Sequence, residues 1–106
     1  MKAAFRASLM VFALALAFST HTFADAGGDT FKAKCAMCHG ATGAGDTVIG
    51  KNLKLRDLGS ADVQKQTDDE LTTIITKGKG KMTPYGGKLT KEQVGDLVKF
   101  IRSLKK

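Results

Sequence analysis

Two cysteines and a histidine lie within one short segment of the chain, Cys35-Ala36-Met37-Cys38-His39. Cysteines three positions apart lie on one turn of a helix, so their sulfur atoms can project to the same side. This spacing matches the two vinyl groups along one edge of a haem, and each thiol can add to a vinyl group to form a thioether. His39 follows directly and can turn its imidazole toward the iron. The pattern Cys-x-x-Cys-His is typical of covalent attachment of a c-type haem.

Other chemistries use the same residue types. A thioredoxin-like Cys-x-x-Cys motif needs a βαβ context, of which the sequence gives no sign. A structural zinc site takes four Cys or His ligands, whereas the chain after residue 24 offers only Cys35, Cys38 and His39. A disulfide between the two cysteines would leave His39 without a role. Haem attachment is the interpretation that uses all three residues.

A second axial ligand for the iron has to come from elsewhere in the chain. After residue 24 there is no histidine besides His39, and the methionines are Met37 and Met82. Met37 lies inside the attachment motif and is badly placed for the opposite face of the haem. Met82 lies close to the single proline, in a loop with glycines on both sides, and such a loop can hold a thioether at the iron. We therefore expect Met82 to be the second ligand; a lysine such as Lys79 or Lys81, or an open position, is the alternative.

The elements that position these residues are predicted to be helical. A first helix should run from about Gly28 into the segment that holds the two cysteines. Residues 40–50 contain four glycines and no clear apolar period, which predicts a loop, and residues 51–66 show no firm period. Strand signals are weak throughout. The expected order is helix, loop, short helix, loop, helix, in an all-α domain.

Two capping-box patterns mark the start of the later helices. Residues 67–70 (TDDE) precede apolar residues at helical spacing, and this helix should end at Gly78. Residues 90–93 (TKEQ) precede the clearest amphipathic pattern in the chain. Its apolar face is formed by Val94, Leu97, Val98, Ile101 and Leu104. The chain should therefore close with a helix that buries one face.

The first 24 residues have the pattern of a secretory signal. Lys2 and Arg6 form a basic segment, residues 9–18 are uncharged and apolar, and small residues lie at and before Ala24. The apolar run is short for a membrane-spanning helix. We expect cleavage after Ala24, which leaves one domain of residues 25–106 in the periplasm without stable membrane insertion. An uncleaved N-terminal anchor is the alternative.

Size and charge limit the kinds of partner. The chain has 106 residues and a formal net charge of +7, and loss of Lys2 and Arg6 without any acidic residue would leave +5. A domain this small benefits from a bound group that enlarges its core. No basic block is interleaved with aromatic residues, so nucleic-acid binding is not indicated. A basic surface favours redox partners with acidic docking surfaces, and plain solubility is the alternative explanation.

The sequence resembles the class I c-type cytochromes, especially the small bacterial electron carriers. Gly27, Phe31 and the Cys-x-x-Cys-His motif are similar to the family's first-helix pattern. Residues 81–85 (KMTPY) resemble its methionine loop, and residues 97–101 (LVKFI) resemble its closing helix. The resemblance implies an all-α small cytochrome c fold, with three to four helices around one covalently bound haem. It also implies that Gly27 lets the first and last helices cross closely, with Phe31 and Phe100 packed there.

The resemblance further implies a monomeric one-electron carrier rather than an enzyme. Its haem iron would alternate between Fe(II) and Fe(III) with His39 and Met82 as ligands. A haem-bearing subunit of a larger oxidoreductase, or a haem-based ligand sensor, is the alternative function.

Two departures from the family pattern affect the surroundings of the haem. Relatives often have a proline whose carbonyl accepts a hydrogen bond from Nδ1 of the histidine ligand. Lys51 stands at that place here, and its carbonyl can accept the same bond. The chain also has no tryptophan. Contacts that relatives make between tryptophan and the haem propionates must therefore be absent or replaced, and the sequence does not assign the propionate partners.

Overall fold

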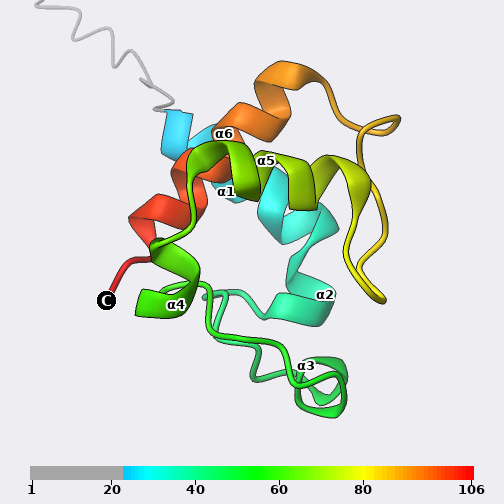
Figure 1. Cartoon of the computed structure of the whole chain (residues 1–106), viewed down its shortest axis with the longest axis vertical. Coiled ribbons are helices and arrows are strands. Elements are labelled where there is room, and N and C mark those ends of the chain that lie inside the picture. The colour runs from blue at the N-terminus through cyan, green and yellow to red at the C-terminus, as the bar shows by residue number, and fades with distance from the viewer. Residues whose placement is uncertain (1–22) are drawn as a thin grey trace, which may run out of the picture.

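The computed structural model describes residues 23–106, and these residues form helices without a β-strand. The helices are α1 (Phe23–Lys34), α2 (Ala36–His39), α3 (Val48–Asn52), α4 (Ala61–Gln64), α5 (Asp68–Lys77) and α6 (Lys91–Ser103). Figure 1 shows α1, α5 and α6 gathered together, with α3 at the far end of the molecule. The all-α prediction is confirmed. Six helices are described rather than three to four, because α2, α3 and α4 have only four or five residues each.

The predicted signal segment lies outside the described residues, apart from its last two. These two, Phe23 and Ala24, belong to the first turn of α1. None of the helices described in residues 23–106 is long and apolar enough to cross a membrane.

Helix α1 begins earlier and ends earlier than the sequence predicted. It begins at Phe23 rather than near Gly28, because alanines favour the helix and Asp25 lies in its first turn, where a negative charge is favourable. It ends at Lys34, and α2 starts again at Ala36. The attachment motif therefore lies on a separate short helix rather than on the last turn of α1.

The crossing of α1 and α6 is the most extensive helix contact in the described part of the chain. A Cβ atom on Gly27 would collide with the backbone carbonyl of Asp96, so only glycine allows this approach. The rings of Phe31 and Phe100 pack beside it, with centroids 4.9 Å apart and planes tilted by 41°. The crossing implied by the family resemblance is therefore confirmed.

Helices α5 and α6 follow their predicted boundaries closely. Both begin with a capping box, in which Thr67 Oγ1 accepts a hydrogen bond from Glu70 N and Thr90 Oγ1 accepts one from Gln93 N. Helix α5 stops at Gly78, as expected. The core lies between these helices, α1 and α4. It consists of Phe31, Val63, Leu71, Ile75, Val94, Leu97, Val98 and Ile101.

Helix α3 begins inside the segment that was predicted to be a loop. Its first turn is stabilised by Thr47, whose Oγ1 accepts a hydrogen bond from Gly50 N at 2.9 Å. Two of its apolar residues face solvent, with Val48 78% exposed and Ile49 39% exposed. No buried apolar period exists in this helix, so periodicity could not predict it.

Candidate functional site

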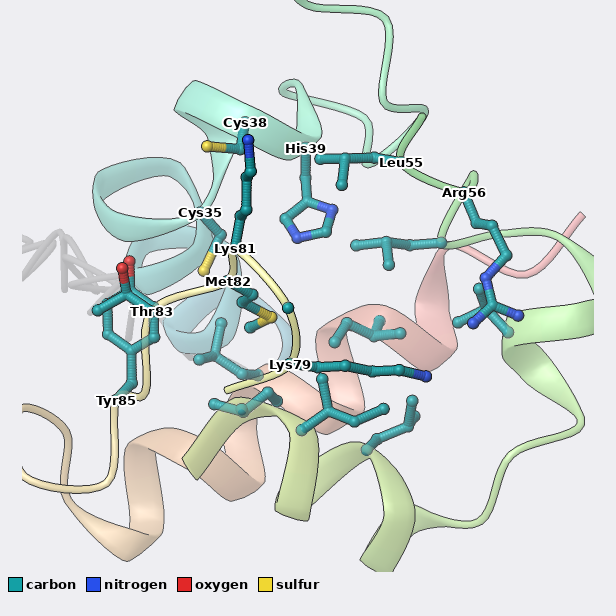
Figure 2. Close-up of a pocket in the computed structure, with 18 of the residues that line it drawn as sticks. Cys35, Cys38, His39, Leu55, Arg56, Lys79, Lys81, Met82, Thr83 and Tyr85 are labelled. Carbon is teal, nitrogen blue, oxygen red and sulfur yellow. The ribbon is translucent and has the colours of Figure 1, made fainter. Parts of the chain in front are cut away.

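A cavity of about 630 Å³ opens between the helices and the loops that follow α3 and α5 (Figure 2). Its volume lies within the range of about 300–1,000 Å³ that is common for small-molecule and cofactor sites. Much of its wall is aliphatic. This wall includes Leu53, Leu55, Val63, Leu71, Ile74 and Leu97. All four predicted site residues, Cys35, Cys38, His39 and Met82, also line the cavity.

Cys35 and Cys38 are partly buried free thiols at one side of the cavity. Their backbone is fixed from α1, because Cys35 N donates to the carbonyl of Phe31 at 2.8 Å. His39 N in turn donates to the carbonyl of Cys35 at 3.0 Å. Burial, and secondly the neighbouring Cys38, raises the pKa of Cys35 to about 11. Cys35 is therefore a neutral thiol at pH 7, which disfavours the reactive thiolate of a redox or zinc site.

The imidazole of His39 points into the cavity (Figure 2). Burial lowers the pKa of His39, so the ring is neutral at pH 7 and keeps a lone pair for a metal. The bond considered from the sequence, between Nδ1 and the Lys51 carbonyl, is not formed. Within residues 23–106 Nδ1 is buried without a hydrogen-bond partner, and the Lys51 carbonyl accepts from Lys54 N at 3.2 Å. Buried ring nitrogens usually have a hydrogen-bond partner, so Nδ1 of His39 is an exception in this part of the chain.

The segment after His39 folds back against the attachment motif. Thr47 Oγ1 donates to the carbonyl of Cys38 at 2.6 Å while it accepts from Gly50 N. A Cβ on Gly50 would lie 2.5 Å from the carbonyl oxygen of Gly45 and 2.8 Å from that of Cys38. Glycine at this position therefore allows α3 to approach α2. Neither Thr47 nor Gly50 was predicted from the sequence, although threonine is a preferred N-cap residue.

Met82 reaches the cavity from the loop after α5. Its backbone N donates to the carbonyl of Lys79 at 3.0 Å, which closes a tight turn. The turn starts at Gly78, which has φ +74°, and a Cβ there would lie 2.5 Å from the Met82 carbonyl oxygen. After Met82 the chain is bound back to α5, because Tyr85 N donates to the carbonyl of Ile75 at 2.9 Å. The methionine side chain therefore has a defined position against the core.

Tyr85 connects the methionine loop to the attachment motif. Its hydroxyl donates to the carbonyl of Lys34 at 3.1 Å, next to Cys35 and 51 residues away in sequence. Burial raises the pKa of Tyr85, so the hydroxyl stays protonated and remains a donor at neutral pH. No role for Tyr85 could be predicted from the sequence, because a contact across this separation leaves no local pattern.

The donor set of the cavity fits a covalently attached haem. Two thiols lie together on one wall, and a neutral imidazole and a thioether enter from segments far apart in the sequence. Imidazole with thioether is an axial pair that haem iron accepts, and apolar walls suit a porphyrin face. No rearrangement of the chain is needed to bring these groups to one cavity.

Comparisons with known proteins agree with this chemistry. Residues 22–101 match the family model described as cytochrome c oxidase, cbb3-type, subunit III. A cytochrome c6 from Picosynechococcus sp. is 32% identical over 109 residues, which cover 95% of this chain and 92% of the relative. A cytochrome c6 from Leptolyngbya boryana is 35% identical over 78 residues, or 74% of this chain and 88% of the relative. The solved structure of the KustC0563 c-type cytochrome has 34% identity and a TM-score of 0.70, and covers 76% of this chain and 98% of its own.

Proposed function

The chain belongs to the class I c-type cytochromes, and we propose that Cys35 and Cys38 attach its haem while His39 and Met82 bind the iron. The protein is a monohaem electron-transfer cytochrome with a covalently attached haem c, as its cytochrome c6 relatives indicate. The residue assignment is supported by one observation above all. A single apolar cavity receives both thiols, the imidazole and the thioether, although Met82 follows His39 by 43 residues.

The bound haem supplies an iron centre that alternates between Fe(III) and Fe(II). The protein would hold this iron through His39 from α2 and Met82 from the loop after α5. No position is then left for a substrate, which favours electron transfer over bond chemistry. The Met82 thioether raises the reduction potential. Aliphatic residues such as Leu53 and Leu97 exclude water and disfavour the additional charge of the oxidised state.

Partner contact is assigned to the side of the molecule where α2 and α3 meet. Met37 and Val48 are each 78% exposed there, and Ile49 is 39% exposed. We call these three residues the α2–α3 patch. Met37 belongs to the attachment motif, so the patch would lie beside the haem edge that the two cysteines hold. A small apolar patch on a basic, monomeric periplasmic protein fits brief contacts with acidic redox partners.

A second function is favoured by one finding, the description of the matching family model as an oxidase subunit. In that case the same cytochrome domain would transfer electrons inside a larger complex. Purification from the native source at low ionic strength separates the two cases. A free carrier elutes alone, whereas a subunit elutes with its complex.

Substitution of the methionine ligand tests the proposed site. In Met82→Ala the Met-to-Fe(III) charge-transfer band of the oxidised protein should disappear and the reduced protein should bind CO. The reduction potential should fall by on the order of 0.1 V, within the roughly 0.8 V that axial ligands span. Met37→Ala is the matched control, because Met37 is exposed at the surface, and it should retain the band. A Met82→Ala protein that kept the band and excluded CO would assign the ligand to another residue.

A further inference from the structure

The charged residues that line the haem cavity have one sign. Among the described residues of its wall none is Asp or Glu. Four are basic. These are Lys34, Arg56, Lys79 and Lys81. An apolar cavity edged only by cations favours a ligand that is apolar in its body and anionic at its rim.

The four cations do not share one side of the cavity. In Figure 2 the sulfur atoms of Cys35 and Cys38 lie on the left, and Lys81 extends on that side. Lys34 directly precedes Cys35 in the chain. The guanidinium of Arg56 and the ammonium of Lys79 both lie toward the right, across the cavity from the cysteines. The cations therefore form two groups at opposite sides of the site.

Haem attachment through Cys35 and Cys38 would explain why cations lie on the opposite side of the cavity. In a haem the two vinyl groups occupy adjacent pyrroles, and the two propionates occupy the other two pyrroles at the opposite edge. If Cys35 and Cys38 fix the vinyl edge, the propionate edge must lie across the cavity, on the side of Arg56 and Lys79. We propose that Arg56 and Lys79 bind the two haem propionates and so orient the haem in its cavity. This inference rests on the proposed attachment through the two cysteines.

The state of both side chains supports the assignment. Within residues 23–106 neither the Arg56 guanidinium nor the Lys79 ammonium has an ion pair or a side-chain hydrogen bond. Arg56 presents a planar fork that matches a carboxylate with two parallel N–H donors. Lys79 is a single mobile charge on a flexible stem. The two residues replace the tryptophan contact that this chain lacks.

The location of the two cations also links haem orientation to the axial ligands. The Lys79 carbonyl accepts the hydrogen bond from Met82 N, so the methionine turn and the proposed propionate partner share one segment. Arg56 follows Leu55, whose backbone N donates to the carbonyl of Gly50 at 2.9 Å. Propionate contacts at these two residues would therefore brace the loops on both sides of the haem.

Nuclear Overhauser contacts in the reduced, diamagnetic holoprotein test this inference directly. The propionate methylene protons should show contacts to side-chain protons of Arg56 and of Lys79, and none to Lys81. Contacts of both propionates to other residues only would overturn the assignment. The wild-type mass is measured first, because a protein without haem overturns the proposed function, whereas a haem protein without these contacts overturns this inference alone.

Reduction potentials of matched variants supply a second readout. Arg56→Gln and Lys79→Gln each remove a cation that would pair with an anionic propionate. Without that cation, the negative charge of the propionate stabilises Fe(III) more strongly. Each substitution should lower the reduction potential. At a fixed applied potential the Fe(III)/Fe(II) ratio should rise about threefold or more, which corresponds to a fall of about 28 mV at about 59 mV per tenfold change. Lys81→Gln, on the cysteine side of the same cavity, should give a clearly smaller shift, and Arg56→Lys should restore part of the potential. Equal shifts in all three glutamine variants would show a general charge effect and contradict specific pairing.

Discussion

At the scale of single residues, burial determines the chemistry of the site. It lowers the pKa of His39 and raises that of Cys35 to about 11, so both groups are neutral at pH 7. A neutral imidazole can bind iron, and a neutral thiol can lie against an apolar wall. The short motif would be ambiguous in an exposed loop. Its position on the wall of an aliphatic cavity is what favours haem attachment over a thiolate site.

Tyr85 offers a test of how the methionine loop is held. Tyr85→Phe keeps the ring but removes the hydrogen bond to the Lys34 carbonyl. We expect a loss of about 0.5–1.5 kcal/mol in the free energy of unfolding, as for other single hydrogen bonds. Urea unfolding followed by circular dichroism measures this difference. An unchanged midpoint and slope would mean that the contact contributes nothing to stability.

The site residues differ in how far the sequence reveals them. The motif of Cys35, Cys38 and His39 is readable because its chemistry depends on local spacing. Met82 was predicted as a ligand by elimination among few candidates. Thr47 and Tyr85 were missed because their roles depend on partners that the fold brings near, the carbonyls of Cys38 and Lys34. Contacts of this kind cannot be read from spacing along the chain.

At the scale of elements, the helices with strong local signals were predicted and those without them were not. Helices α5 and α6 have capping boxes and buried faces, so their start and end agree with the sequence analysis. Helix α3 has exposed apolar residues and is stabilised by one threonine cap, so its sequence shows no amphipathic period. The break between α1 and α2 at Cys35 was also missed, because no proline or glycine marks it.

The crossing of α1 and α6 predicts opposite effects of two glycine substitutions. Gly27→Ala places a methyl group against the Asp96 carbonyl and should destabilise the fold by about 1–3 kcal/mol. Gly95→Ala adds a methyl group in open space within α6 and should stabilise it by up to about 1 kcal/mol. Thermal unfolding of both variants measures the contrast. Equal effects of the two substitutions would show that the close approach at Gly27 has no energetic consequence.

At the scale of the whole molecule, the fold encloses a cavity beside its apolar core. Eight apolar residues are buried among those the structure describes, and several of them also line the cavity. A chain of this size gains stability when a large apolar group completes such an interior. Covalent attachment of the haem also suits electron transfer, because the group cannot dissociate while the protein diffuses between partners.

The charge of the molecule predicts how salt affects its reactions. The chain after residue 24 carries a formal charge of +5, and two ionised propionates would leave about +3 on the holoprotein. Electron transfer with a small anionic reagent should therefore slow as ionic strength rises and the Debye length falls from about 30 to about 8 Å. Stopped-flow rates measure this trend. A cationic reagent is the control and should react faster at high salt; the reverse order would contradict a basic reactive surface.

The attachment site can be tested most directly on one peptide. Cleavage after Lys34 and Lys51 releases residues 35–51, which contain Cys35, Cys38 and His39 and no other cleavage site for trypsin. When the protein is made with haem-maturation machinery, this peptide should carry the visible absorbance and the mass of one haem. The same peptide recovered at its bare mass, from a protein made under those conditions, would contradict covalent haem attachment through the two cysteines.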